Sequence, residues 1–271
     1  MSTRITSRRA DLLSERLSER DLEIVATLDK LRCATASQLE RLHRSDSNPI
    51  ANARQIRRIL QKLVRLRVLT RLDRRIGGVR AGSSAYVYAL DVAGQRVASA
   101  SGPAGGFRLR RPWTPGYSFI AHRLAISELY VELVEAERSG SCELLAYDAE
   151  PLSWRRFPGP HGGYLTLKPD AFVRLGLGEF EDSYFVEIDR GTESLPAVAR
   201  KLLAYRRHWQ SGREQARLGV YPRVLIVVDA AARREAIKDV VRRQPADAQP
   251  LFEVLLTDAA LSTLTAREAP A

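Results

Sequence analysis

The stretch at positions 167–205 constrains the fold of this chain more than any other part. Two runs of alternating apolar and polar residues flank a turn rich in glycine, which predicts a β-hairpin. Asp170 lies on the first strand, and Glu187 and Asp189 lie on the second. Residues two positions apart on a strand point to the same face of the sheet. We therefore expect Glu187 and Asp189 to share a face, which Asp170 joins if the register allows.

Carboxylates that meet at one point of a sheet raise each other's pKa unless a cation lies between them. Oxygen ligands of this kind suit Mg²⁺ or Mn²⁺. A single carboxylate in such a hairpin is more often an exposed edge charge, but the combined pattern favours a functional site. The sequence thus predicts Asp170 and Glu187 as metal ligands, with Asp189 as a further ligand or a base.

The pair Pro169-Asp170 followed by Glu187 resembles the motif of the PD-(D/E)XK nuclease superfamily. In that superfamily the aspartate and the first acid of an E-x-K triplet bind the metal, and the lysine assists the attacking water. This chain has Asp189 at the lysine position, so its triplet reads E-x-D. Lys201 on the next predicted helix is the candidate replacement, and a surface lysine lying along the protein is the alternative.

Basic residues are concentrated in the first part of the chain. The formal net charge is +11, and up to Thr114 there are 23 Lys and Arg against 10 Asp and Glu. The remainder holds 20 basic against 22 acidic residues. A strongly basic segment joined to a nearly neutral one predicts a dedicated module for a polyanion, with double-stranded DNA favoured over a membrane.

The basic segment predicts the element order of a winged helix-turn-helix. A helix begins at Ser18, a short helix begins at Thr35, and a third helix covers 53–66 after a polar loop at Asn48-Pro49. Two strands, at 69–72 and 86–90, complete the wing. A helix of this kind fits the major groove of B-DNA, and the wing reaches a flanking groove or the backbone.

Basic side chains line the third helix and the wing with almost no acid among them. A solvated helix face is the ordinary explanation of such a stripe, but the wing continues the same charge. The residues predicted to bind DNA are Arg54, Arg57, Arg58, Lys62, Arg65, Arg74, Arg75 and Arg80.

The chain is expected to be α/β, or α+β overall, with two domains. We predict a flexible N-terminus at 1–17, a winged-helix domain at 18–98 and a linker at 99–116. A nuclease-like mixed-sheet domain follows at 117–260, and a flexible C-terminus at 261–271. The start of the chain has no apolar segment typical of a secretory signal, and no apolar run is long enough to span a bilayer. A cytoplasmic protein with reduced Cys33 and Cys142 is expected.

Longer segments identify the chain as similar to the replication-relaxation family. These are A-H-R-L-A-I-S-E-L, K-P-D-A-F and V-E-I-D-R-G-T-E-S. The resemblance implies a DNA-binding protein of a plasmid or mobile element, with a role in replication, relaxation or mobilisation. Its implied partners are double-stranded DNA, a second copy of the chain, and replication or mobilisation proteins.

Two functions remain open at this point. The first is a metal-dependent DNA endonuclease that nicks DNA with Mg²⁺ or Mn²⁺. The second is a winged-helix transcriptional regulator or accessory factor without catalysis, whose degenerate nuclease-like domain makes protein contacts. The E-x-D triplet in place of E-x-K is the feature that favours the second.

Overall fold

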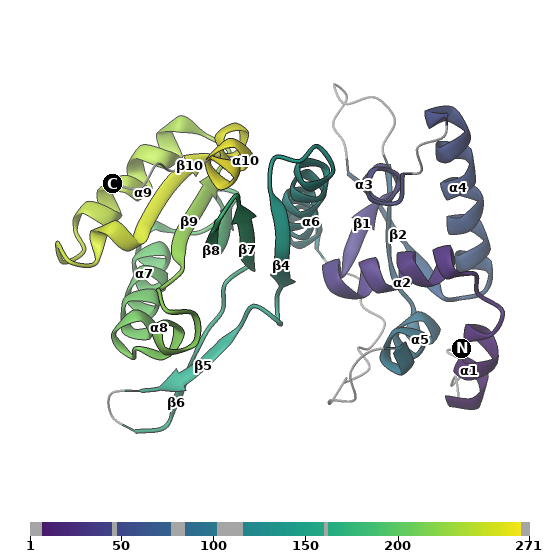
Figure 1. Cartoon of the computed structure of the whole chain (residues 1–271), viewed down its shortest axis with the longest axis horizontal. Helices are drawn as coiled ribbons and strands as arrows, with labels where there is room; N and C mark the ends of the chain where they lie inside the picture. Colours follow the sequence, from purple (N-terminus) through teal and green to yellow (C-terminus); the bar gives the residue numbers. More distant parts are fainter. Residues whose placement is uncertain (1–6, 45–47, 77–84, 102–115, 160–161, 267–271) are drawn as a thin grey trace. The chain divides into compact units, whose positions relative to one another are not determined.

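The computed structural model describes residues 7–44, 48–76, 85–101, 116–159 and 162–266. The chain divides into two compact units, Met1–Val131 and Glu132–Ala271. Helices combine with a mixed sheet, so the fold is mixed α/β as predicted (Figure 1). No helix in the described residues is long and apolar enough to cross a membrane.

The first unit contains a three-stranded antiparallel sheet in the order β1-β3-β2. Its elements along the chain are α1 (Ser7–Ser14), α2 (Glu19–Leu31), β1 (Cys33–Thr35), α3 (Ala36–Leu42), α4 (Pro49–Arg65), β2 (Leu69–Ile76), β3 (Ala85–Leu90), α5 (Val92–Ser101) and the start of α6 (Tyr117–Arg138). The sequence did not predict α1, β1 or α5. Helix α1 and the buried Leu17 lie within the segment that was expected to be a flexible terminus.

Side-chain caps fix where the first helices begin. Ser18 caps α2 in a reciprocal capping box with Asp21, and Thr35 does the same for α3 with Gln38. Helix α4 begins earlier than predicted, because Asn48 caps it and Pro49 occupies its first turn. Proline suits that position since its missing N–H would have no partner there.

The first half of α6 packs in the first unit. Ile120 and Leu124 form a cluster with Cys33 and Val87. The buried Arg123 side chain donates to the Leu31 carbonyl at 3.1 Å. The division between the units therefore falls inside α6. The domain limits proposed from the sequence, which place all of this helix in the second domain, remain a prediction.

The second unit is built on a five-stranded sheet in the order β10-β9-β8-β7-β4. Its elements are β4 (Glu143–Ala149), β5 (Arg155–Pro158), β6 (Tyr164–Leu167), β7 (Ala171–Leu177), β8 (Phe180–Asp189), α7 (Leu195–Gln210), α8 (Arg213–Leu218), β9 (Arg223–Val228), α9 (Ala231–Arg242), the 3₁₀ turn η1 (Gln249–Leu251), β10 (Phe252–Leu256) and α10 (Thr257–Thr265). Strands β4, β7 and β8 pair antiparallel, and β8, β9 and β10 pair parallel. Strands β5 and β6 form a separate antiparallel ribbon.

The predicted hairpin is the centre of this sheet. Phe172 on β7 pairs with Phe185 on β8, and both are buried against α7 and α9. Glu187 and Asp189 follow Phe185 at intervals of two, so they point to the same helix-covered face. The alternation along β8 therefore directs these carboxylates toward the helices that cover this face.

Candidate functional site

Glu187 is a buried carboxylate held by two side chains from α7. Lys201 donates from Nζ to Oε2 at 2.9 Å, and Tyr205 donates its hydroxyl hydrogen to Oε1 at 2.6 Å. Only 5% of Glu187 is exposed. Lys201 and Tyr205 are four residues apart, so both project from the same face of the helix. Lys201 is the predicted replacement for the lysine that the E-x-D triplet lacks. It therefore lies beside Glu187, the first acid of that triplet.

Asp170 is buried near Glu187 and Lys201, and it immediately precedes β7 in the chain. Its Oδ2 accepts a hydrogen bond from the backbone N–H of Ile188 at 2.8 Å, which ties the start of β7 to β8. Burial, together with the negative charge of Asp170, raises the pKa of Glu187 to about 7. The structure therefore brings Asp170, Glu187 and Lys201 together, and their roles as metal ligands and catalytic lysine stay a prediction.

Lys201 also bonds to a carboxylate that sequence reasoning missed. Its Nζ lies 2.9 Å from Glu193 Oε1, in the loop before α7. Burial alone lowers the pKa of Lys201, but Glu187, Glu193 and Asp170 outweigh it and raise the pKa above its ordinary value. The lysine is therefore a firmly charged ammonium between two acids. Nothing in the pattern of Glu193 distinguished it from an exposed loop residue.

Asp189 is placed in a separate ion pair. Arg233 on α9 donates to its two carboxylate oxygens at 2.6 and 3.1 Å, and also to the Glu193 carbonyl at 2.7 Å. A bidentate arginine of this kind satisfies both oxygens of a carboxylate. Asp189 shares the sheet face of Glu187, as its spacing indicated, but Arg233 occupies it. A ligand or base role for Asp189 stays a prediction.

Two carboxylates, Asp170 and Glu187, are the candidate ligands for a divalent cation. Among the described residues no group of three or more His, Cys, Asp or Glu side chains is arranged to hold a metal ion. Asp170 and Glu187 form a pair of carboxylates, and oxygen donors are what Mg²⁺ and Mn²⁺ prefer. Burial and the neighbouring Asp170 raise the pKa of Glu187, although Lys201 and Tyr205 act in the opposite direction. A cation bound beside these two carboxylates would favour the ionised form of Glu187.

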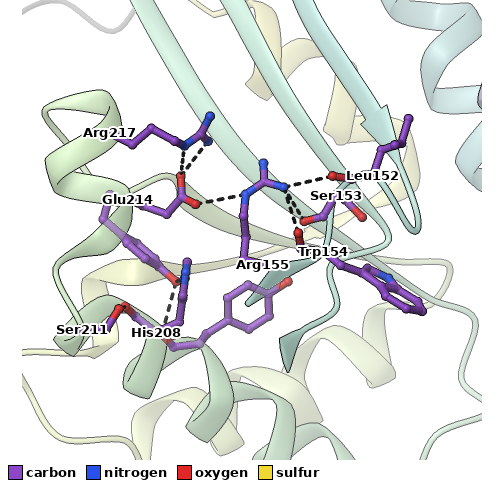
Figure 2. A network of polar contacts seen from close by, with 10 residues as sticks. Leu152, Ser153, Trp154, Arg155, His208, Ser211, Glu214 and Arg217 are labelled. Atoms are coloured by element: carbon purple, nitrogen blue, oxygen red, sulfur yellow. Dashed lines mark hydrogen bonds and ion pairs between the residues drawn. The ribbon is translucent and has the colours of Figure 1, made fainter. Parts of the chain in front are cut away.

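A layer of contacts behind the site fixes the backbone that carries Asp170. Ser153 donates from Oγ to the Pro169 carbonyl at 2.5 Å, and the Glu150 N–H donates to the Asp170 carbonyl at 3.0 Å. Arg155 donates to the carbonyls of residues 152, 153 and 154 at 3.1, 2.8 and 3.3 Å, as Figure 2 shows.

Arg155 is in turn held by the buried Glu214 of α8. The Arg155 Nε donates to Glu214 Oε1 at 3.0 Å, and Arg217 donates to the other oxygen at 2.7 Å (Figure 2). Burial lowers the pKa of Arg155 despite this partner. These residues were not predicted, because they come from separate segments that only the fold brings together.

The basic face of α4 is the second candidate site. The side chains of Arg54, Arg57, Arg58 and Arg65 are exposed, and none of the described acidic residues forms an ion pair with them. Lys62 differs, because it is paired with Asp21, whose side chain is 1% exposed. Although burial raises the pKa of Asp21, hydrogen bonds from Lys62 and Ser18 lower it below its ordinary value.

The other residues predicted to bind DNA belong to the wing. Arg74 and Arg75 lie on β2, but their side chains are outside the described ones, and Arg80 lies outside the described residues. The start of α4 is fixed by Arg20, which donates to Asn52 Oδ1 at 2.8 Å and to Gln55 Oε1 at 3.0 Å. The set of DNA-binding residues remains a prediction. Within it, Lys62 also forms an ion pair with Asp21 of the fold.

The raised pKa of Glu187 predicts that the free energy of unfolding depends on pH. In the unfolded chain Glu187 has its ordinary pKa of 4.5 and loses its proton above that pH. In the folded protein it keeps the proton until the pH reaches about 7. The stability from this group is full below pH 4.5 and is lost as the pH rises through about 7. At about 1.4 kcal/mol per pH unit the loss is on the order of 3 kcal/mol.

Urea unfolding between pH 5 and pH 8 checks this prediction. The wild type is expected to lose stability with rising pH relative to Glu187→Gln, whose amide does not titrate. The measurement is made in EDTA, so that no divalent ion binds the carboxylates. A difference between the two proteins that is independent of pH would contradict the prediction.

A match to a known protein family covers both candidate sites. The family model described as replication-relaxation matches residues 25–224. Neither the comparison with curated proteins nor that with solved structures gave a match. The matched region includes α4 and the residues Asp170, Glu187 and Lys201, and it covers well over half of the 271 residues. The chain therefore belongs to the replication-relaxation family.

Proposed function

We propose that this protein binds double-stranded DNA through its first unit and nicks DNA with a divalent cation through its second unit. The observation that carries the catalytic part is the approach of Lys201 Nζ to Glu187 Oε2, at 2.9 Å, beside the buried Asp170. This set resembles the donors of a PD-(D/E)XK nuclease, with the lysine supplied by α7 instead of by the strand. The family name points to a setting in replication or relaxation of a plasmid or mobile element.

The DNA-binding part is supported by the first unit's topology. Helix, strand, helix, helix and two strands follow one another there, with β1, β3 and β2 in one sheet. This is the element order of a winged helix-turn-helix, in which α4 would be the recognition helix. Its exposed arginines have no acidic partner among the described residues, so they are available to phosphates and to guanine edges.

Each residue of the carboxylate site would have a distinct task. Asp170 and Glu187 would hold Mg²⁺ or Mn²⁺, which when bound polarises a phosphate and lowers the pKa of a water molecule. The Lys201 ammonium would stabilise negative charge that develops on the scissile phosphate. Tyr205 would keep the Glu187 carboxylate in one orientation through its hydroxyl group.

A supercoiled plasmid tests the proposal directly. With Mg²⁺ or Mn²⁺ the wild type is expected to convert supercoiled plasmid to the open circular form, and EDTA should prevent this. Glu187→Gln, which removes one ligand charge, should be inactive at equal DNA occupancy. A wild type that leaves the plasmid supercoiled with both metals, while it binds the DNA, would disprove the catalytic part.

A second function is favoured by one specific observation. Both oxygens of Glu187 are already bonded, and Lys201 is shared between Glu187 and Glu193. Such a network can serve as a purely structural ion-pair cluster. In that case the protein would be a DNA-binding accessory factor or regulator, and its second unit would make protein contacts. Inactivity on plasmid without any thermal stabilisation by Mg²⁺ or Mn²⁺ would favour this function.

A further inference from the structure

The β5–β6 ribbon is amphipathic in a way that neither function above explains. One face carries Phe157 and Leu167, which are buried in the core of the second unit. Arg156 pairs with Thr166 and Pro158 pairs with Tyr164, so these four residues point to the other face. The ribbon extends beyond the five-stranded sheet in Figure 1. Its second face is exposed to solvent.

The exposed face presents aromatic rings paired with cations. The Arg156 guanidinium lies 4.1 Å from the centroid of the Tyr164 ring, and Lys168 Nζ lies 4.7 Å from that of Trp154. Tyr164 is 61% exposed and Trp154 is 38% exposed. Trp154 and Lys168 adjoin the four residues of this face at the start of β5 and the end of β6 and are exposed as well, and none of these six described residues is acidic.

The contacts behind the ribbon hold this face in position. Arg155 donates hydrogen bonds to the three carbonyls at 152–154. Figure 2 shows the Trp154 ring directed away from the Arg155–Glu214 pair. The same segment bonds to the Pro169 carbonyl through Ser153. Lys168 is followed in the chain by Pro169 and Asp170. The chain therefore passes within two residues from the exposed Lys168 to the buried Asp170.

We propose that this face binds single-stranded DNA. Exposed aromatic rings accept any unpaired base by stacking, and neighbouring cations meet the phosphates of the same strand. In a duplex the base faces are covered by their neighbours, so the rings have nothing to stack on. Tyr164 and Trp154 would each take a base, while Arg156 and Lys168 would contact phosphates. The inference rests on the proposed function and deepens it, because Lys168 on this face lies two residues before Asp170 in the chain.

Binding of a labelled oligothymidylate in EDTA tests the proposal without any cleavage. Stacking is worth about 1–3 kcal/mol per base, so Trp154→Ala with Tyr164→Ala should weaken binding by at least about tenfold. Fluorescence anisotropy on the full chain gives the affinity, and the affinity for a duplex should not change. Tyr164→Phe keeps the ring and should retain binding.

Phe180→Ala is the matched control. Phe180 is 62% exposed on the same unit, but its sequence neighbours are Glu179 and Glu181. Its removal should leave the affinity for the single strand unchanged. A second variant, Arg156→Gln with Lys168→Gln, should lower the salt slope of single-strand binding by about 1.4, at about 0.7 per phosphate contact. The thermal midpoint of each variant shows that the fold is kept.

Three results would overturn the proposal. The first is a parent protein that does not bind oligothymidylate, and the second is a double variant that binds it like the parent. The third is an equal loss in Phe180→Ala. These results do not depend on plasmid nicking. Loss of single-strand binding in the double variant, with no nicking by the wild type, would support the ribbon and refute the catalytic proposal.

Discussion

Replacing Asp170 with asparagine is expected to abolish both the stabilisation by Mg²⁺ and the nicking of supercoiled plasmid. An ion that binds only the folded state raises the thermal midpoint by mass action, and this needs the ligand set to be intact. The amide of asparagine carries no charge, so the carboxylate pair would lose half of its negative charge. Calorimetry with and without Mg²⁺, run beside the plasmid assay, measures both effects.

Lys201→Met separates metal binding from catalysis in the same assay. The methionine keeps much of the length of the side chain but removes the ammonium that faces Glu187. We expect the Mg²⁺ stabilisation to persist, since the carboxylates are freed from a competing cation. Nicking should fall by about 10²–10³, as for the loss of one group that stabilises transition-state charge.

The control is Glu181→Gln on the same strand as Glu187. Glu181 is exposed near the start of β8, at the opposite end of the strand from Glu187. It forms an ion pair with Arg174 of β7. This variant should keep metal stabilisation and nicking at the level of the parent. If Asp170→Asn retains the Mg²⁺ stabilisation, the carboxylates beside Lys201 do not hold the ion and the catalytic proposal is wrong.

Replacing Arg54, Arg57 and Arg58 together with alanine is expected to lower duplex affinity by about a hundredfold or more. Each bidentate contact of an arginine with a guanine is worth about 1–3 kcal/mol. Each phosphate contact also contributes through counterion release, so the salt dependence of binding should become shallower. All three side chains are exposed, and Ile56 and Leu60 carry the buried face of α4. The variant should therefore fold like the parent.

The matched control lies on α9, where Arg234, Lys238 and Arg242 form a second basic row. These residues pair with Glu235 and Asp239, unlike the arginines of α4. Their triple replacement should leave duplex affinity nearly unchanged in titrations at two salt concentrations. If both triple variants bind duplex alike, net charge determines affinity and α4 is not the recognition helix.

Lys62 is excluded from this experiment because its expected phenotype is different. Lys62 neutralises Asp21, which is buried at the start of α2. Its removal would leave a buried carboxylate without its cation, so a loss of affinity in Lys62→Ala would be mixed with a loss of stability. The stripe that the sequence indicated therefore combines exposed arginines with one lysine that supports the fold.

The sequence by itself determined the local features of this protein. The alternation around positions 167–189 predicted a hairpin, and β7 and β8 form it, with a register that the sequence had left open. Ser18 and Thr35 predicted the starts of two helices, because a cap depends only on residues three positions apart. The replication-relaxation family was also evident from short segments, and the family match confirms it.

The tertiary structure alone decided which partner each charged residue has. Asp189 and Glu187 are equivalent by spacing, yet the first pairs with Arg233 of α9 and the second with Lys201 and Tyr205 of α7. Glu214 and Arg155 are 59 positions apart in the chain and hold the segment behind Asp170. Period and propensity describe one element at a time. An ion pair depends on how two elements pack, which local sequence does not encode.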